Sequence, residues 1–134
     1  MTLRLVQQSS TSVKYSGTWT TAAGTAYSGG SVKWRKGVYA SATYAFTGSG
    51  IGFVTAKAAL RGKVFVYVDG VKRATLDLRG ATSNRLVAFV RGLAYGPHTV
   101  KVVALGTAGR PRVDLDGFVV LRVPPPIVPG SPSN

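Results

Sequence analysis

The chain has 134 residues, the length of a single domain, and this is enough to bury a core without disulfide bonds. It contains no cysteine, so thiol catalysis and zinc sites built on cysteine are excluded. Seventeen Lys and Arg against four acidic residues, all Asp, give a net charge of +13. Such a charge attracts polyanions, namely nucleic acid, wall polymers, acidic lipids or an acidic protein surface, although general solubility or a host's basic bias would also explain it.

The sequence lacks the apolar segments that membrane spans and signal peptides need. No apolar run approaches the roughly 18 residues of a membrane span, so no membrane insertion is expected. The first residues, MTLRLVQQSSTS, lack the apolar region of a signal peptide. We expect either an excised piece of an exported protein or a complete protein that is not exported by that route.

Alternating apolar and polar residues recur along the chain, and helix signals are nearly absent. Residues 38–47 alternate over the length of a whole strand. Strands are predicted near residues 3–7, 12–16, 31–35, 38–47, 50–56, 63–69, 71–78, 84–91, 98–105 and 112–122. Many short strands with a turn every 8–12 residues predict an all-β fold, an antiparallel β-sandwich or jelly roll, although a barrel shares this pattern.

The clearest local signal is Asp69-Gly70, between two strand-like runs in GKVFVYVDGVKRATLDL. This dipeptide favours a two-residue type I′ hairpin, in which both central residues take positive φ. Asp69 is therefore interpreted as a turn residue rather than a catalyst. The Pro-rich residues 123–134 cannot pair in a sheet, and they predict an extended tail or linker after a sandwich domain at 1–122.

Taken in order, six segments resemble galactose-binding-domain-like jelly rolls, a bacterial family common as modules appended to actinobacterial extracellular enzymes. The matching segments are YSGTWTTA (15–22), YSGGSVKW (27–34), ATYAFTGSGIGFV (42–54), GKVFVYVDGVKRATLDL (62–78), LAYGPHTVKVVAL (93–105) and RVDLDGFVVL (112–121). The resemblance covers about 110 residues and implies a non-catalytic sandwich whose relatives bind carbohydrate through loops at one end. It carries over no particular sugar-site residue.

The inventory of reactive side chains argues against an enzyme. The single histidine, His98, follows the Gly96-Pro97 turn and precedes an alternating strand. The family that this chain resembles also has a His at this turn. A general base, by contrast, needs a positioned nucleophile or acid beside it. A turn-supporting role is therefore favoured. His98 against a carboxylate inside a deep cleft would overturn this interpretation.

Asp114 and Asp116 are the candidate metal ligands. At i and i+2 of one predicted strand they would project to the same face, where they could do acid–base work on a sugar or coordinate Ca²⁺ with carbonyl oxygens. The favoured alternative is that both face water beside Arg110 or Arg112 while Val113 and Leu115 point into the core. No other cofactor is predicted.

Candidate ligand-binding residues are aromatic rings and nearby cations. On a strand, Trp34 would face the core with Val32, leaving Lys33 and Arg35 solvated. The functional alternative is that Trp34 stacks on a sugar while Lys33, Arg35 and Lys36 bond its hydroxyls or carboxylates. Three rings beside turns or glycines are further candidates, because loops often carry binding residues: Trp19, Tyr27 and Tyr95. Trp19 could instead pack with Tyr15 at the edge of the core.

Cationic clusters offer a second candidate surface if they converge: Lys33-Arg35-Lys36, Arg61-Lys63 and Lys72-Arg73. They would form a polyanion patch whose binding weakens as salt rises. Nucleic acid is ranked below wall or glycan polymers, because no nucleic-acid-binding signature accompanies the charge.

Three functions follow from these observations. The leading hypothesis is a non-catalytic module that binds carbohydrate or an anionic cell-surface polymer, extracellular or at the cell surface within a larger protein. The second is a structural subunit of a larger assembly, such as a phage tail or head-decoration protein of a virion, with homo-oligomer or capsid neighbours. The third is an accessory domain that spaces or stabilises a neighbouring enzyme.

Overall fold

The structure, a computed structural model, describes residues 2–8, 10, 12–17, 19–23, 31–36, 38–110 and 112–123. None of these residues forms a helix long and apolar enough to cross a membrane. They form ten strands, all paired antiparallel. The strands are β1 (Thr2–Gln7), β2 (Val13–Ser16), β3 (Thr20–Ala23), β4 (Ser31–Lys36), β5 (Val38–Lys57), β6 (Lys63–Val68), β7 (Val71–Asp77), β8 (Ser83–Leu105), β9 (Arg112–Leu115) and β10 (Gly117–Arg122). The predicted all-β antiparallel sandwich is confirmed.

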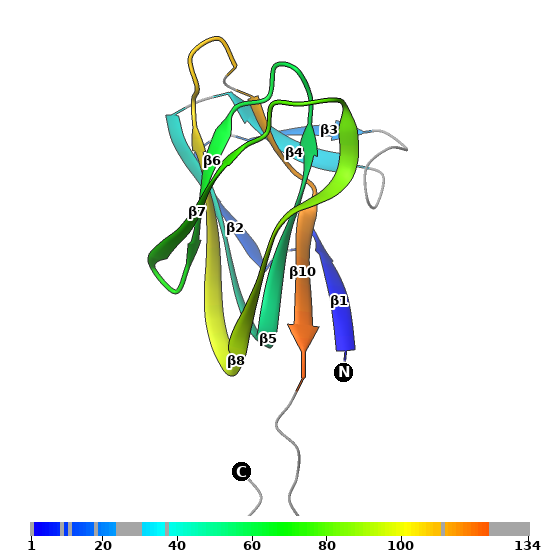
Figure 1. The fold of residues 1–134 in the computed structure, drawn as a ribbon, viewed down its shortest axis with the longest axis vertical. Coiled ribbons are helices and arrows are strands. Elements are labelled where there is room, and N and C mark those ends of the chain that lie inside the picture. Colours follow the sequence, from blue (N-terminus) through cyan, green and yellow to red (C-terminus); the bar gives the residue numbers. More distant parts are fainter. Residues whose placement is uncertain are drawn as a thin grey trace, which may run out of the picture.

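The centre of the fold is a long ribbon of β5 and β8, which pair from Val38–Leu105 to Lys57–Ser83. Figure 1 shows β8 descending on one side of the molecule, turning at its lower end and rising on the other side. Gly48 pairs with Gly96 and Gly50 with Gly92 at this turn. We expected separate strands on either side of these glycines. The structure joins them, because glycines let the ribbon fold over without ending its pairing.

Folding the ribbon creates the two layers of the sandwich (Figure 1). The first half of β5 pairs with β2, and the second half of β8 pairs with β6, which continues to β7. We call this set of strands the β6 layer. The second half of β5 pairs with β10, which continues to β1, and with the first half of β8. We call this set the β10 layer.

The core lies between the two layers. The β6 layer contributes alternate residues whose side chains are buried, among them Val64, Val66 and Val68. Phe118 of the β10 layer is fully buried, and its ring centroid lies 5.7 Å from Tyr44 and 6.3 Å from Phe53. Burying one such side chain contributes about 1.5–3 kcal/mol, so these rings supply much of the stability of the fold.

A small sheet in the order β3-β4-β9 lies at the end opposite the turn of the ribbon (Figure 1). Strand β3 was not predicted. The predicted strand 112–122 is also divided: β9 pairs with β4 in the small sheet, Asp116 follows it, and β10 belongs to the β10 layer. Gly117 permits this crossing, since a Cβ there would overlap the carbonyl oxygen of Val6.

The hairpin predicted at Asp69-Gly70 is present. Val68 pairs with Val71 across the turn, and the φ angles of Asp69 and Gly70 are 52° and 79°. Both central residues therefore take the positive φ that a type I′ turn requires. Most of the predicted tail, residues 124–134, lies outside the described residues.

Candidate functional site

Trp19 packs at the edge of the core. Its ring centroid is 5.4 Å from that of Tyr15, and its Nε1 donates a hydrogen bond of 3.2 Å to the carbonyl oxygen of Ser16. The side chain is partly buried against the core cluster. This matches the packing alternative considered for Trp19, and a ligand contact there stays a prediction.

The other predicted ligand-binding residues do not lie at one place. Tyr95 is in β8 at the turn of the ribbon, where its hydroxyl accepts a hydrogen bond of 3.2 Å from Arg122 Nη2. Trp34, Arg35 and Lys36 belong to β4 at the opposite end of the molecule (Figure 1), where the structure describes the backbone and not these side chains. Tyr27 lies outside the described residues.

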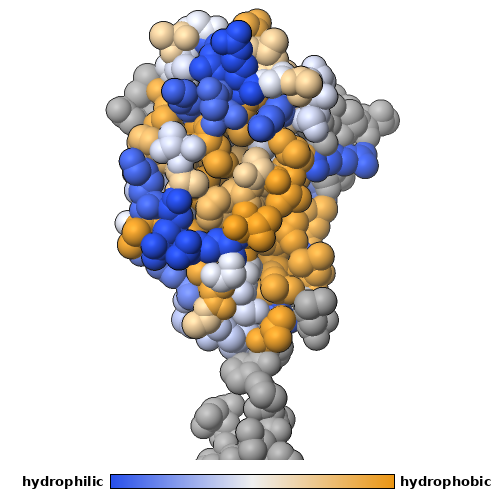
Figure 2. Space-filling view, viewed as in Figure 1, coloured by the Kyte–Doolittle hydropathy of each residue, from blue (hydrophilic) through white to orange (hydrophobic). Residues whose placement is uncertain are grey.

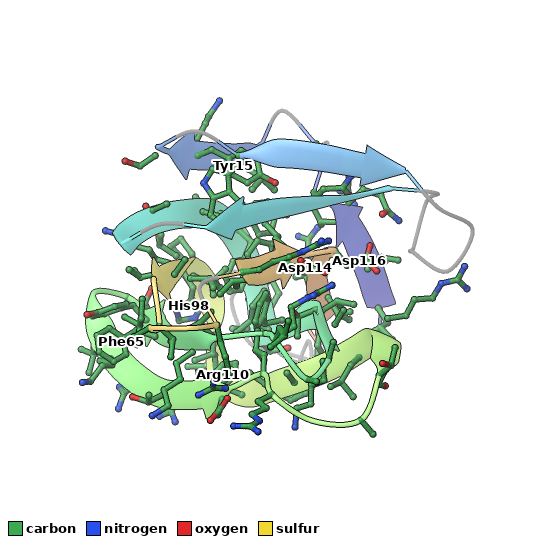
Figure 3. All side chains as sticks on the ribbon, turned by 90° about the horizontal axis from the view of Figure 1, so that it is seen from above. Tyr15, Phe65, His98, Arg110, Asp114 and Asp116 are labelled. Atoms are coloured by element: carbon green, nitrogen blue, oxygen red, sulfur yellow. The ribbon has the colours of Figure 1, made fainter. Side chains whose placement is uncertain are left out.

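Asp114 and Asp116 are buried, with exposed fractions of 0% and 1%, so the expectation that they face water is wrong. Arg112 Nε lies 2.9 Å from Oδ1 of Asp114, and Arg61 Nη2 lies 3.2 Å from Oδ2. These guanidinium groups bond both carboxylate oxygens of Asp114, and a cation bound there would have to compete with them. Figure 3 shows the two Asp residues near each other, but Asp116 lies beyond the end of β9 and not on the same strand.

No three His, Cys, Asp or Glu side chains gather at one place in the described part of the chain. A Ca²⁺ ion needs six or more oxygen ligands, and Asp114 offers its oxygens to arginines instead. The structure does not test calcium binding at Asp114 and Asp116, but these arginine contacts argue against it.

His98 does lie against a carboxylate. Its Nδ1 is 2.6 Å from Oδ2 of Asp69, and its Nε2 is 2.7 Å from the carbonyl oxygen of Ala94. Asp69 Oδ1 accepts a further hydrogen bond of 2.8 Å from the backbone N–H of Thr99. Both ring nitrogens thus face acceptors, so each nitrogen carries a proton and donates, and neither is available as a base in this arrangement.

The electrostatics of this pair agree with its geometry. The acceptor at Ala94 and the hydrogen bond to Asp69 raise the pKa of His98 above its usual 6.5. Hydrogen bonds from His98 and from Thr99 lower the pKa of Asp69 below its usual 3.8. The pair is therefore a charged clamp that joins β8 to the β6–β7 turn, which supports the turn-supporting role expected for His98.

Beside the clamp, two adjoining hollows open on the outer surface of the β6 layer, and each has a volume of about 480 Å³. The first is shallow and lined by Ala45, Phe46, Thr47, Asp69, Pro97, His98 and Thr99. The second is lined by Thr43, Tyr67, Gly70, Thr99, Lys101 and Val103. Thr99 belongs to both hollows. The carboxylate beside His98 therefore borders an open surface and not a deep cleft.

Aromatic side chains stand on this outer surface. Because Val64, Val66 and Val68 point into the core, Phe65 and Tyr67 point outward from β6, and Figure 3 shows Phe65 at the margin of the molecule. The two rings meet edge to face, with centroids 6.2 Å apart. Lys72 Nζ lies 4.2 Å from the centre of the Phe65 ring, a cation–π contact.

We name this surface the β6 face and define it by Phe65, Tyr67, Thr43, Thr99, Lys72 and Lys101. Sequence reasoning assigned no binding role to its two rings. The available signal was the alternation in KVFVYV, in which valines alternate with rings. A strand that places aromatic side chains on its solvent side while valines fill the core side indicates a surface that contacts something.

The β10 layer has a different outer surface, which is apolar. Leu3 and Val90 are 67% and 73% exposed, and Leu5 and Val87 are also exposed. A hollow of about 350 Å³ lies among them, bordered by Val119 and other apolar residues. Figure 2 shows apolar side chains on the right, over β10 and β1, and hydrophilic ones on the left, near the β6–β7 hairpin.

Comparison with known proteins finds relatives both by sequence and by fold. No family model matches the chain. The A type blood N-acetyl-alpha-D-galactosamine deacetylase of Flavonifractor plautii is 30% identical over 108 residues, which cover 80% of this chain. The chain spans only 14% of the length of that curated relative.

Solved structures with the same fold share little sequence. The CBM36-1 domain of a multidomain xylanase from the hindgut metagenome of Trinervitermes trinervoides has a TM-score of 0.61 at 14% identity, covering 92% of this chain and 99% of that domain. The Agl-KA catalytic domain gives 0.61 at 18% identity, with 98% of this chain and 29% of that chain covered. A Paenibacillus xanthan lyase has a TM-score of 0.64 at 13% identity, and the match covers 89% of this chain and 13% of that chain. These likenesses show the β-sandwich fold.

Proposed function

We propose that this chain is a non-catalytic carbohydrate-binding module of the galactose-binding-like type, extracellular or at the cell surface within a larger protein. The observation that carries the proposal is the β6 face, where a ring, hydroxyls and cations surround two joined hollows. Two comparisons support it, namely the deacetylase that shares 30% identity and the CBM36-1 domain that is matched over 99% of its length. An actinobacterial parent protein belongs to the same proposal.

Tyr67 is the proposed stacking platform. It lines the second hollow, whereas Lys72 already covers one side of Phe65. The C–H-rich side of a pyranose ring packs on an aromatic ring, which presents a large apolar surface at little cost in side-chain entropy. Thr43, Thr99 and Lys101 border the same hollow and would bond the sugar hydroxyls.

A non-catalytic role fits the state of His98. A general base needs a nitrogen lone pair aimed at the proton to be removed. The hydrogen-bond acceptors at Asp69 and Ala94 occupy both ring nitrogens, which makes the imidazole a structural cation. The β6 face therefore holds a ligand without supplying the acid–base pair that hydrolysis of its glycosidic bonds requires.

Glycan binding by matched variants tests this proposal. Tyr67→Ala should abolish binding on a glycan array and in titrations with the positive glycans, while thermal unfolding stays close to that of the parent chain. Tyr95→Ala is the matched control, since it removes a surface tyrosine at the turn of the ribbon. Loss with Tyr95→Ala, or with Trp34→Ala, and retention with Tyr67→Ala would move the site to the loops and β4. An array negative for both neutral and acidic glycans would reject carbohydrate binding altogether.

A structural subunit of a larger assembly is the second candidate function. The apolar outer surface of the β10 layer favours it, because exposed apolar patches of soluble proteins mark contacts with other proteins. A phage tail or head-decoration protein, or an accessory domain packed on a neighbouring enzyme, would use such a surface. Sedimentation at high concentration tests self-assembly: a monomer throughout would count against the subunit and leave the carbohydrate proposal standing.

A further inference from the structure

Lysines alternate with other residues along one line across the β6 face. Lys14 of β2 pairs with Thr43 of β5, Thr43 pairs with Lys101 of β8, and Lys101 pairs with Tyr67 of β6. Tyr67 in turn pairs with Lys72 of β7. Residues directly opposite each other on antiparallel strands project to the same side, so these five residues form one row across five strands.

The row faces solvent. Lys14, Lys72 and Lys101 are exposed, while Val13 and Val102, which neighbour two of them in sequence, are buried in the core. Among the ion pairs of the described residues, none includes Lys72 or Lys101. The nearest acid along β6 is Asp69, whose oxygens are bonded by His98 and Thr99. The row is therefore a positive stripe that has no acidic residue within it.

The distance between neighbouring lysines of the stripe indicates which kind of polymer would fit it. Neighbouring strands lie about 4.8 Å apart, so lysines on alternate strands recur about every 10 Å across the sheet. That distance is comparable with the length of two pyranose rings in an extended polysaccharide. A chain that crosses the strands and bears an anionic group on every second sugar would bring one anion to each lysine.

We propose that the β6 face binds an acidic polysaccharide with a carboxylate or sulfate on alternate sugars, lying along the row Lys14–Thr43–Lys101–Tyr67–Lys72. This inference rests on the proposed carbohydrate-binding function and specifies its ligand. Tyr67 stacks on a sugar ring between Lys101 and Lys72, and Thr43 bonds a hydroxyl between Lys14 and Lys101. The net charge of +13 adds long-range attraction for the polymer.

The test compares polysaccharides that differ in their charged groups. Hyaluronan oligosaccharides carry a carboxylate on alternate sugars, carboxyl-reduced hyaluronan removes the charge from the same backbone, and chondroitin sulfate adds sulfate. We expect the two acidic polymers to bind at least roughly tenfold tighter than the reduced one at low salt, with affinity falling as salt rises. Chondroitin sulfate carries a sulfate as well as the carboxylate, so tighter binding of chondroitin sulfate than of hyaluronan would show that sulfate strengthens the contact. Equal affinity for reduced and native hyaluronan would overturn the inference.

Two double variants localise the effect. Lys72→Gln with Lys101→Gln should lower acidic-polymer affinity by roughly tenfold or more, and should lower neutral-glycan affinity by less, because a neutral sugar loses only the hydrogen bond of Lys101. Lys57→Gln with Arg79→Gln removes the same charge away from the β6 face and should leave most of the affinity. Equal losses in both double variants would mean that net charge alone attracts the polymer, and would reject the row.

Failure of this inference is distinguishable from failure of carbohydrate binding. If Tyr67→Ala removes binding of neutral glycans while the lysine variants change nothing, the carbohydrate-binding function is supported and the acidic ligand is rejected. If no glycan binds, both the carbohydrate-binding function and the acidic ligand are rejected. A single-stranded oligonucleotide serves as the remaining comparison. Tighter binding of the oligonucleotide than of hyaluronan, with the same dependence on Lys72 and Lys101, would assign the face to nucleic acid instead.

Discussion

His98 joins two segments of the sandwich through Asp69, with Nδ1 of the imidazole 2.6 Å from Oδ2 of the carboxylate. The backbone N–H of Asp69 also donates to the carbonyl oxygen of Thr99 at 2.8 Å. The β6–β7 turn is thereby held against β8 next to the hollows of the β6 face. The clamp therefore fixes the edge of the candidate site.

This clamp predicts how stability depends on pH. The pKa of His98 is raised in the folded chain, so its stabilisation is complete below the unfolded value of 6.5 and is lost as pH rises through the folded value. The pKa of Asp69 is lowered, so its stabilisation is complete above 3.8 and is lost as pH falls through the folded value. The clamp should therefore contribute most between about pH 4 and 6.5.

Thermal unfolding of the parent chain and His98→Gln checks this prediction. The difference in Tm between the two chains should be larger at pH 5.5 than at pH 9. The reason is that the His98 imidazolium, which only the parent chain has, is deprotonated as pH rises. A difference that is constant over this range would mean that His98 does not titrate against Asp69.

Two paired glycines at the turn of the ribbon should respond differently to substitution. A Cβ at Gly48 would lie 2.7 Å from the carbonyl oxygen of Leu121 and 2.9 Å from Val120 Cγ1, whereas a Cβ at Gly96 would meet nothing within 4 Å. We expect Gly48→Ala to lower the free energy of unfolding by about 1–3 kcal/mol, the usual cost of overpacking. Gly96→Ala should be tolerated, which urea unfolding of both variants would show. Equal losses would contradict the crowding that we assign to Gly48.

The buried carboxylate of Asp114 should matter more than an exposed one. Removing one partner of a buried pair costs about 3–5 kcal/mol, and we expect Asp114→Ala near the lower end because Arg61 and Arg112 can reach water. Asp77 also bonds an arginine, Arg110, but its side chain is 46% exposed. Asp77→Ala is thus the control and should destabilise much less. The urea midpoints of the two variants measure this difference in stability. Similar midpoints would argue that burial is not what makes the loss of Asp114 costly.

Calcium should leave the unfolding temperature unchanged. The arginines that bond Asp114 repel a cation, and only Asp116 would remain as a nearby carboxylate. Thermal scans with millimolar calcium and with a chelator test this directly. A rise in Tm with calcium that disappears in Asp116→Asn would restore the metal site predicted from the sequence.

Local signals predicted the strands and the hairpin well. Asp69-Gly70 specifies its turn through two adjacent φ angles, so sequence neighbours were sufficient. Gly48 and Gly96 were treated as strand ends, although they mark where paired strands bend. The division after Leu115 was missed because apolar residues continue on both sides of Asp116, and a continuing apolar pattern cannot show that a strand changes sheets.

The candidate site could not be predicted in the same way. Lys14, Thr43, Lys101 and Lys72 come from four strands far apart in the chain, and only the register of the sheet places them beside Tyr67. Sequence reasoning therefore favoured rings near glycines. It grouped cations by their proximity in the chain, which put Lys72 with Arg73 rather than with Lys101.

The folded ribbon also has a consequence for how the domain unravels. Strands β5 and β8 each run through both layers, so one layer cannot melt while the other persists. Unfolding should be a single cooperative transition with coincident spectroscopic and calorimetric midpoints. Refolding must bring Val38 to Leu105 across half of the chain before those contacts stabilise the fold. We therefore expect a refolding time in the range of milliseconds to seconds that is typical of β-sandwiches.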